Sequence, residues 1–391
     1  MSHTRRTTIY LDNNATTPLD PRVLDAMLPV FSEHFGNPAS ATHAWGWYAA
    51  ELVTIARERV ANLIRARPEE IIFTSGATES CNLALKGAVA AAPSSAPKQL
   101  ITVTTEHRAT LDPLRTLGTR GWKITELPVQ RDGTLEMKSL EHALQQGAYL
   151  VSVLLANNEI GVLHDVPAIA ALARRHGALI HCDATQALGK LQIDVTTLGV
   201  DFLSCSAHKL YGPKGIGALF VRESTRQQVL APLLEGGGHE RGYRSGTLNT
   251  PGIVGFGMAC EIAAQSLHSD AHQMTQLAHA LLTRLEQSLG PLPLNGPGKE
   301  RLPGNLNIVI PGVDSSRLLG ALGTTVALSA SSACQSATPH ASHVLTALGL
   351  PPAQQRQSIR IGIGRFTTEA DVEGAASAIT HAAEKIRRSA T

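Results

Sequence analysis

Short apolar segments alternate with helical patterns through the first 257 residues, and this alternation restricts the fold more than any other feature. Each apolar segment has the length of a buried strand, and helical patterns such as 140–146 and 167–176 lie between most of them. Strands that alternate with helices form a mostly parallel sheet with helices on both faces. We therefore expect an α/β domain with strands at residues 71–74, 99–104, 122–127, 148–155, 178–182, 201–204 and 216–221.

The pattern changes after about Gly257. A long amphipathic helix is predicted over 258–289, and a Pro/Gly-rich stretch follows it. The remaining segments indicate a smaller α+β domain. Its strands are predicted at 306–310, 326–329 and 359–362, and its helices at 315–322, 341–348 and 368–387.

The segment SAHKLYGPKG, residues 206–215, places Lys209 in a glycine-containing turn between two predicted strands. A lysine that is buried in such a turn loses proton affinity, because its charged form is desolvated. A neutral amine in a pocket can bond covalently to a carbonyl cofactor, of which pyridoxal phosphate (PLP) is the obvious one. The alternative is a surface lysine in a hairpin turn.

Asp183 follows a short apolar strand in the segment HCDATQ, residues 181–186. It therefore falls at the carboxyl end of the predicted sheet, where ligands of α/β proteins bind. PLP withdraws electrons only while its ring nitrogen is protonated, and a neighbouring carboxylate keeps that proton in place. Gln186 can donate to the phenolate oxygen of the ring. The alternative for Asp183 is a strand-end turn or a helix cap.

The segment FTSGATES, residues 73–80, reads as a strand, a turn of small residues and the start of a helix. Free N–H groups and the positive end of the helix dipole meet at such a point and favour an anion. Ser75 and Thr78 add hydroxyl donors, so a phosphate fits here. A plain helix cap with Thr78 at the N-cap is the alternative.

Cys334 lies within SASSACQSA, residues 329–337, a run of small polar residues with no helical or strand period. We interpret this run as a mobile loop. A thiol on an exposed, flexible loop is a candidate nucleophile. The alternative is an incidental free cysteine.

These segments, in this order, resemble the cysteine desulfurases of the NifS/IscS type, which are class-V aminotransferase-like enzymes. The resemblance runs nearly end to end. The matching motifs are YLDNNATTPLDPRV (10–23), FGNPAS (35–40), FTSGATES (73–80), TEHRAT (105–110), LLANNEIGVL (154–163), HCDATQALGK (181–190), SAHKLYGPKGIGAL (206–219), GGGHERGYRSGTLN (236–249), SSAC (331–334) and SIRIGIGRFTTE (358–369).

The resemblance implies a PLP-dependent transferase of fold type I. A large PLP-binding domain would span 16–257, and a small domain, 1–15 with 258–391, would carry the mobile Cys334 loop. The implied reaction converts L-cysteine to L-alanine and transfers the sulfur to Cys334 as a persulfide. The sulfur would then pass to an acceptor protein, for example in iron–sulfur cluster, thio-cofactor or tRNA pathways.

The resemblance also implies a role for each matching residue. Lys209 would bind PLP covalently, His107 would stack on the ring and handle protons, and Cys334 would accept the sulfur. Asp183 would hold the ring nitrogen and Arg360 the substrate carboxylate. Asn158 would lie near the substrate and the phenolate oxygen, and Gln186 would contact that oxygen as well. The implied phosphate contacts are Ala77, Thr78, Ser206, His208 and Thr247. Thr247 would come from a second subunit, so the resemblance also implies a homodimer.

The composition agrees with this interpretation. The net charge is +2 and no basic block is present, so we expect no nucleic-acid partner, and no apolar run approaches the length of a membrane span. Five scattered cysteines without a CxxC motif, and an amino-terminal segment without an apolar signal core, suit a reducing compartment, so we expect a cytoplasmic protein. The histidines show no metal-ligand spacing, so we expect no metal site.

Other functions remain open from the residues alone. A selenocysteine lyase or an aminotransferase would use the same cofactor, and a non-enzymatic interaction protein would make Lys209 incidental. An aminotransferase would require a keto acid and no thiol. The sequence also departs from the family at Cys81, where the resemblance suggests asparagine or aspartate, and we expect this cysteine to be a small buried residue.

Overall fold

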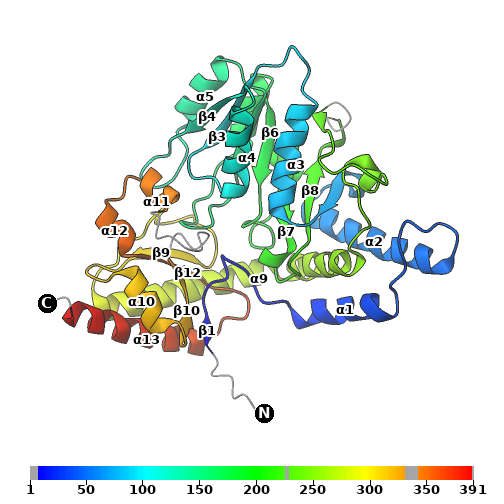
Figure 1. Cartoon of the computed structure of the whole chain (residues 1–391). Helices are drawn as coiled ribbons and strands as arrows, with labels where there is room; N and C mark the ends of the chain where they lie inside the picture. The colour runs from blue at the N-terminus through cyan, green and yellow to red at the C-terminus, as the bar shows by residue number, and fades with distance from the viewer. Residues whose placement is uncertain (1–7, 225–228, 331–341, 390–391) are drawn as a thin grey trace.

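The computed structural model describes residues 8–224, 229–330 and 342–389 (Figure 1). At its centre lies a seven-stranded sheet with the strand order β2-β8-β7-β6-β5-β3-β4. Only β8 runs antiparallel to its neighbours, so the mostly parallel seven-stranded sheet predicted from the sequence is confirmed. The strands are β2 (Ile71–Thr74), β3 (Gln99–Val103), β4 (Lys123–Leu127), β5 (Leu150–Leu154), β6 (Leu179–Asp183), β7 (Phe202–Ser206) and β8 (Gly217–Val221).

Helices cover both faces of this sheet, and successive residues of one strand enter different cores. In β5, Leu150 packs with residues of α3 and α4, whereas Val151 belongs to the core with α2, α5 and α6. Strands that are buried on both faces are nearly continuous apolar runs. This is why most of them could be located from the sequence; β4, at the edge of the sheet, is only partly buried. The helices are α2 (Ala44–Leu63), α3 (Ala77–Ala90), α4 (Arg108–Gly118), α5 (Met137–Gln145), α6 (Val166–Arg175) and the short α7 (Val195–Leu198).

A smaller unit, drawn at the lower left of Figure 1, has a core of its own. Its sheets are β1-β10 and β11-β12-β9, so the amino-terminal strand packs with the carboxyl-terminal part, as fold type I implies. Its elements are β1 (Ile9–Tyr10), β9 (Asn305–Val309), α10 (Ser315–Leu322), β10 (Val326–Ala327), β11 (Ser329–Ala330), α11 (His343–Ala347), α12 (Pro352–Arg356), β12 (Ser358–Gly362) and α13 (Glu369–Arg388).

The prediction of one strand over 326–329 was wrong. The chain forms two short strands there, because β10 pairs with β1 whereas β11 pairs with β12. Leu328 lies between them, where the chain passes from one sheet to the other. Apolar pattern alone does not show a change of pairing partner.

The helix α9 (Thr250–Leu289) connects the two units and begins eight residues before the predicted start at 258. Its first half contributes Phe256 and Ala263 to the core of the large unit, and its second half contributes Met274 and Leu281 to the smaller core. The predicted domain boundary at 257/258 thus falls within one continuous helix. That boundary stays a prediction.

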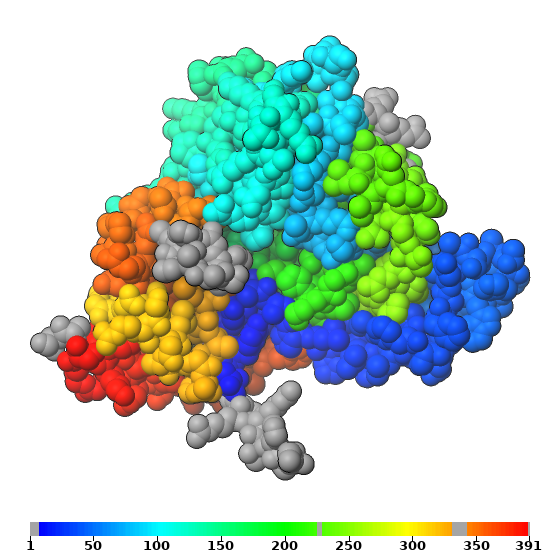
Figure 2. Space-filling view, in the orientation of Figure 1, coloured from blue at the N-terminus to red at the C-terminus, as the bar shows by residue number. Residues whose placement is uncertain are grey.

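The helix α1 (Pro21–Ser32) and the first turns of α2 extend away from the body of the molecule, at the right of Figures 1 and 2. Several large apolar side chains on this arm are exposed to solvent: Leu24, Leu28, Phe31, Phe35, Trp45, Trp47 and Tyr48. No helix within the described ranges is both long and apolar enough to span a membrane.

Candidate active site

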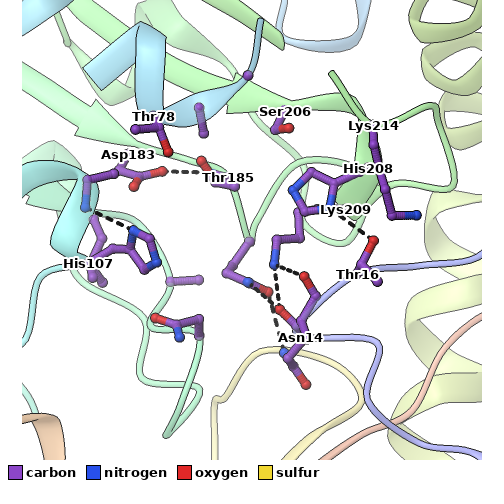
Figure 3. Close-up of a pocket in the computed structure, with 18 of the residues that line it drawn as sticks. Asn14, Thr16, Thr78, His107, Asp183, Thr185, Ser206, His208, Lys209 and Lys214 are labelled. Atoms are coloured by element: carbon purple, nitrogen blue, oxygen red, sulfur yellow. Dashed lines mark hydrogen bonds between the residues drawn. The ribbon is translucent and has the colours of Figure 1, made fainter. Parts of the chain in front are cut away.

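A cavity of about 480 Å³ opens at the carboxyl ends of the central strands. Its walls come from the turn after β2, the ends of β5, β6 and β7, the amino-terminal segment and β12 of the smaller unit. The side chains in Figure 3 point into this space from several sides. Eleven residues that the sequence analysis selected line it: Ser75, Ala77, Thr78, His107, Asn158, Asp183, Gln186, Ser206, His208, Lys209 and Arg360.

One wall is the amino-terminal end of α3. Its N-cap, Gly76, makes no side-chain capping bond and has φ +151°, a conformation that favours glycine. The strand β8 approaches so closely that a Cβ at Gly217 would lie 2.7 Å from the Cα of Gly76. Ala77 and Thr78, the first two residues of α3, line the cavity at the positive end of the helix dipole, where an anion is stabilised.

Asp183 is the last residue of β6. Its Oδ1 atom accepts the Thr185 backbone N–H at 2.9 Å, and this bond orients the carboxylate at the cavity wall (Figure 3). Gln186 donates to the Asn14 carbonyl at 2.9 Å and accepts from the Asn14 amide at 3.4 Å. The sheet end and the amino-terminal segment are thereby joined on one side of the site.

Lys209 ends the short helical turn that follows β7, so it lies between two buried strands as predicted. The side chain itself is half-buried rather than buried, because its Nζ atom faces the cavity. Nζ donates to the carbonyls of Asn14 and Ala15, at 2.6 Å each. Next to it, the His208 ring bonds Thr16 Oγ1 at 3.1 Å, and burial lowers the pKa of His208 to about 4. A neutral His208 can donate to an anion through one ring nitrogen.

His107 caps α4 and lies on the same side of the cavity as Asp183 in the view of Figure 3. Its Nδ1 atom accepts the Ala109 backbone N–H at 3.1 Å, which leaves the proton of the neutral ring on Nε2. Burial lowers the pKa of His107, with a smaller opposing effect from Asp183. The lowered pKa favours the neutral ring, in which Nε2 carries the proton.

Arg360 extends from β12 to the cavity, and its side chain is 2% exposed. The guanidinium pairs with Asp12 Oδ1 at 2.9 Å and donates to the Asn158 carbonyl at 3.4 Å. Its Nε atom is buried and has no hydrogen-bond partner among the described residues. A guanidinium with unused donors at a cavity wall is suited to bind a carboxylate.

One selected residue that the structure describes is not in this cavity. Thr247 is exposed and lies outside the cavity lining. Cys334 lies outside the described residues. Cys81 is fully buried, as expected, and burial raises the pKa of its thiol well above the ordinary value.

Sequence reasoning missed three residues that organise the site: Asp12, Asn14 and Thr185. Asp12 and Asn14 belong to a motif that was recognised, but their partners lie 172 to 348 residues away along the chain. Nothing in the local pattern identifies such partners. Thr185 acts through its backbone N–H, which every residue other than proline offers.

The groups around the cavity fit PLP. An uncapped helix end suits a phosphate, a carboxylate suits a protonated ring nitrogen, and an amine beside both suits an aldehyde carbon. The comparison with known families agrees, because the model of the family "Aminotransferase class-V" matches residues 9–374. The chain belongs to this family of PLP-dependent enzymes.

Individual relatives indicate a more specific activity within this family. The chain is 48% identical over 380 residues to cysteine desulfurase IscS of Anaeromyxobacter dehalogenans, and the match covers 97% of this chain and 93% of that relative. Among solved structures, a NifS-like protein has a TM-score of 0.89 at 36% identity, with 96% of this chain and 99% of that chain covered. The structure described as SspA in complex with cysteine has a TM-score of 0.81 at 34% identity, with 92% and 99% covered.

Proposed function

We propose that this protein is a PLP-dependent cysteine desulfurase. The observation that carries the proposal is the convergence of Lys209, Asp183, His107 and Arg360 on one cavity of a class-V aminotransferase. The reaction balances as L-cysteine plus the Cys334 thiol giving L-alanine plus the Cys334 persulfide. The relatives named cysteine desulfurase support this choice of substrate.

The residues at the cavity have separate roles in the proposed reaction. The first turn of α3, with Ser206 and His208, would hold the phosphate, and Asp183 would hold the proton of the ring nitrogen. Gln186 and Asn158 would contact the phenolate oxygen. The helix end and the Asp183 carboxylate lie on the same wall of the cavity, so one bound cofactor would be held at its phosphate and at its ring nitrogen.

Arg360 binds the carboxylate of L-cysteine through the donors that Asp12 leaves free. PLP, when bound, would supply the electron sink for removal of the substrate Cα proton. The Lys209 amine would take that proton. His107 would lie at the cofactor ring and move protons through Nε2. Cys334 attacks the substrate sulfur as a thiolate and retains it.

The reaction is tested with the purified holoenzyme, L-cysteine and a thiol reductant. We expect alanine to form without any keto acid. The Cys334→Ala variant should retain the cofactor and bind L-cysteine but form no persulfide, whereas Cys260→Ala, which removes a buried thiol, should retain turnover. Full turnover by Cys334→Ala would refute the role of Cys334, and a requirement for a keto acid would indicate an aminotransferase.

The proposal also includes a homodimer in which Thr247 contacts the phosphate of the partner's site. The exposed apolar arm of α1 and α2 supports it, since patches of this kind mark interaction sites. Light scattering should give the mass of a dimer, and Phe31→Asp with Trp47→Asp should give a monomer. In mixed dimers, a Lys209→Ala subunit should restore PLP affinity to a Thr247→Ala partner, and its failure to do so would contradict a contact between subunits.

The sulfur held on Cys334 is proposed to pass to an acceptor protein, in a reducing compartment such as the cytoplasm. The four cysteines among the described residues are all free thiols, which supports this setting. Incubation of the persulfide-loaded enzyme with radiolabelled sulfur and a lysate should label an acceptor. Label that remains entirely on Cys334 would contradict the transfer.

A further inference from the structure

Two buried side chains close to the site are not used by the proposed reaction. Tyr211 lies two residues after Lys209, and Arg365 lies five residues after Arg360. Tyr211 is 3% exposed and the side chain of Arg365 is 8% exposed. Neither residue lines the cavity. Any effect that they have on the reaction must therefore pass through residues that do line it.

The backbone of Tyr211 has φ +65°, the left-handed conformation that is costly for a residue with a bulky side chain. Such a conformation persists only where the surrounding structure holds it. Three hydrogen bonds do so here: its N–H donates to Thr17 Oγ1 at 2.8 Å, its carbonyl accepts the Asp20 N–H at 3.0 Å, and its phenol oxygen accepts the backbone N–H of Arg365. Every polar group of this tyrosine thus has a partner outside its own turn.

The same contacts hold the turn that carries Lys209. The Thr17 hydroxyl donates to the His208 carbonyl at 3.0 Å and accepts the Tyr211 N–H, so it bonds the chain on both sides of Lys209. The Thr17 N–H also donates to the His208 carbonyl, at 3.0 Å. A displacement of Tyr211 would therefore move the backbone of Lys209 and its amine.

Arg365 supports the ring of Tyr211 from the smaller unit. Its guanidinium carbon lies 4.4 Å from the centroid of that ring, which is a cation–π contact. Each guanidinium nitrogen has a protein partner: Nε bonds Asp270 Oδ2 at 2.7 Å, Nη1 bonds Asp20 Oδ2 at 3.2 Å, and Nη2 bonds Ser266 Oγ at 3.3 Å. A planar group that is held by two carboxylates and a hydroxyl has one orientation, so it fixes the ring that it covers.

Arg360 and Arg365 belong to one short segment of the smaller unit, since Arg360 lies in β12 and Arg365 in the turn that follows it. One end of this segment would bind the substrate carboxylate, and the other end contacts Tyr211. The substrate Cα is bonded to that carboxylate, and the Lys209 amine must reach the Cα proton. The contact between Arg365 and Tyr211 thus ties the place of the substrate to the place of the amine.

We propose that Tyr211 and Arg365 are positioning residues that hold the Lys209 amine in reach of the substrate bound at Arg360. The inference rests on the proposed function and adds to it. Proton transfer depends steeply on distance, so loss of this contact should slow the step that Lys209 performs. The binding of L-cysteine should change little, because Arg360 keeps its own partner, Asp12.

The first test measures proton removal apart from sulfur transfer, in holoenzyme that carries Cys334→Ala. Exchange of the Cα proton of L-cysteine with D₂O should fall by about 10-fold in Tyr211→Phe, which leaves the Arg365 N–H without its acceptor, and the half-saturating concentration of L-cysteine should change by less than about twofold. Tyr149→Phe is the matched control: Tyr149 is also buried, and its hydroxyl donates to the Ala88 carbonyl at 3.1 Å, at the end of β5 opposite the cavity. This control should exchange at the full rate. An unchanged rate in Tyr211→Phe, or an equal loss in Tyr149→Phe, would overturn the positioning role.

The second test asks whether Arg365 acts through Tyr211. Arg365→Lys keeps a positive charge beside the two aspartates but loses the planar group over the ring. Exchange should again fall by about 10-fold, and the variant that combines Arg365→Lys with Tyr211→Phe should lose less than the product of the two single losses. Losses that multiply would show two separate effects and overturn the proposed route. Absence of a cofactor band, or of exchange in Cys334→Ala alone, would instead contradict the proposed function.

Discussion

At the scale of single residues, the site depends on charges that are held by partners from other parts of the chain. Arg360 is the clearest case, because a buried guanidinium is costly unless it is paired. The Arg360 guanidinium donates to the Asp12 carboxylate through one nitrogen and to the Asn158 carbonyl through another. The planar group is thus fixed in orientation before the substrate carboxylate binds.

Arg360→Lys should raise the KM for L-cysteine by about 10- to 100-fold, because one ammonium replaces two parallel donors. The cofactor band should be retained, since Arg360 does not hold PLP in the proposed arrangement. Steady-state kinetics of alanine formation measure the change, with the exposed Arg131→Lys as the control. A wild-type KM in Arg360→Lys would place the substrate carboxylate elsewhere.

Asp183→Asn should keep PLP bound but slow the exchange of the substrate Cα proton by about 100-fold or more, because a neutral amide does not hold the ring-nitrogen proton. Deuterium incorporation from D₂O measures this step apart from sulfur transfer. Normal exchange in the variant would mean that another group organises the electron sink.

At the scale of elements, α9 and α2 approach each other so closely that only glycine fits at one position. A Cβ at Gly257 would lie 2.6 Å from the Cα of Ala56 on α2. Glycine within a helix is unfavourable by itself. Gly257 is therefore explained by the close packing of the two helices. The position shows how local propensity is overridden by contact between helices.

Gly257→Ala should lower the free energy of unfolding by about 1–3 kcal/mol, since the added methyl group would force the two helices apart. Gly320→Ala is the matched control: it also lies inside a helix, α10, but a Cβ there has no atom within 4 Å. That variant should gain up to about 1 kcal/mol. Urea unfolding measures both, and a gain in Gly257→Ala would show that the helices can adjust.

Most elements could be predicted because their patterns are local. The strand 71–74 and the helix 315–322 have the predicted bounds, and the central strands differ only at their ends. The first turns of α9 were missed because the Gly-rich sequence around residues 252–257 resembles a loop, although its glycines permit close helix packing. Local pattern does not show what a segment packs against.

At the scale of the whole molecule, acid should destabilise the fold through buried histidines. Burial lowers the pKa of His164 and His181 to about 4, whereas a histidine in an unfolded chain titrates near 6.5. Between these values the unfolded state binds more protons. The stabilisation is therefore fully present above about pH 6.5 and is lost as the pH falls towards 4.

His164→Phe removes one such group. The loss of unfolding free energy between pH 7 and pH 5 should be smaller by about 2 kcal/mol than in the wild type. Urea titrations at the two pH values measure the difference, and His272→Gln, at an exposed position, should leave it unchanged. An equal loss in His164→Phe and the wild type would show that His164 is protonated in the folded state.

The site could be predicted only as far as its motifs are recognisable. The selected residues reach the cavity because most of them follow strands whose carboxyl ends meet at one edge of the sheet. The Asp12–Arg360 pair joins residues that are 348 positions apart, and Lys209 Nζ donates to the Asn14 carbonyl 195 positions away. Such contacts depend on the assembled fold, so no local pattern could have indicated them.

Four residues between Asp12 and Thr16 contact the site in chain order: Asp12 bonds the arginine at 360, Asn14 and Ala15 bond the amine at 209, and Thr16 bonds the imidazole at 208. An amino-terminal truncation that reached this stretch would harm catalysis even though no residue assigned to the cofactor would be deleted.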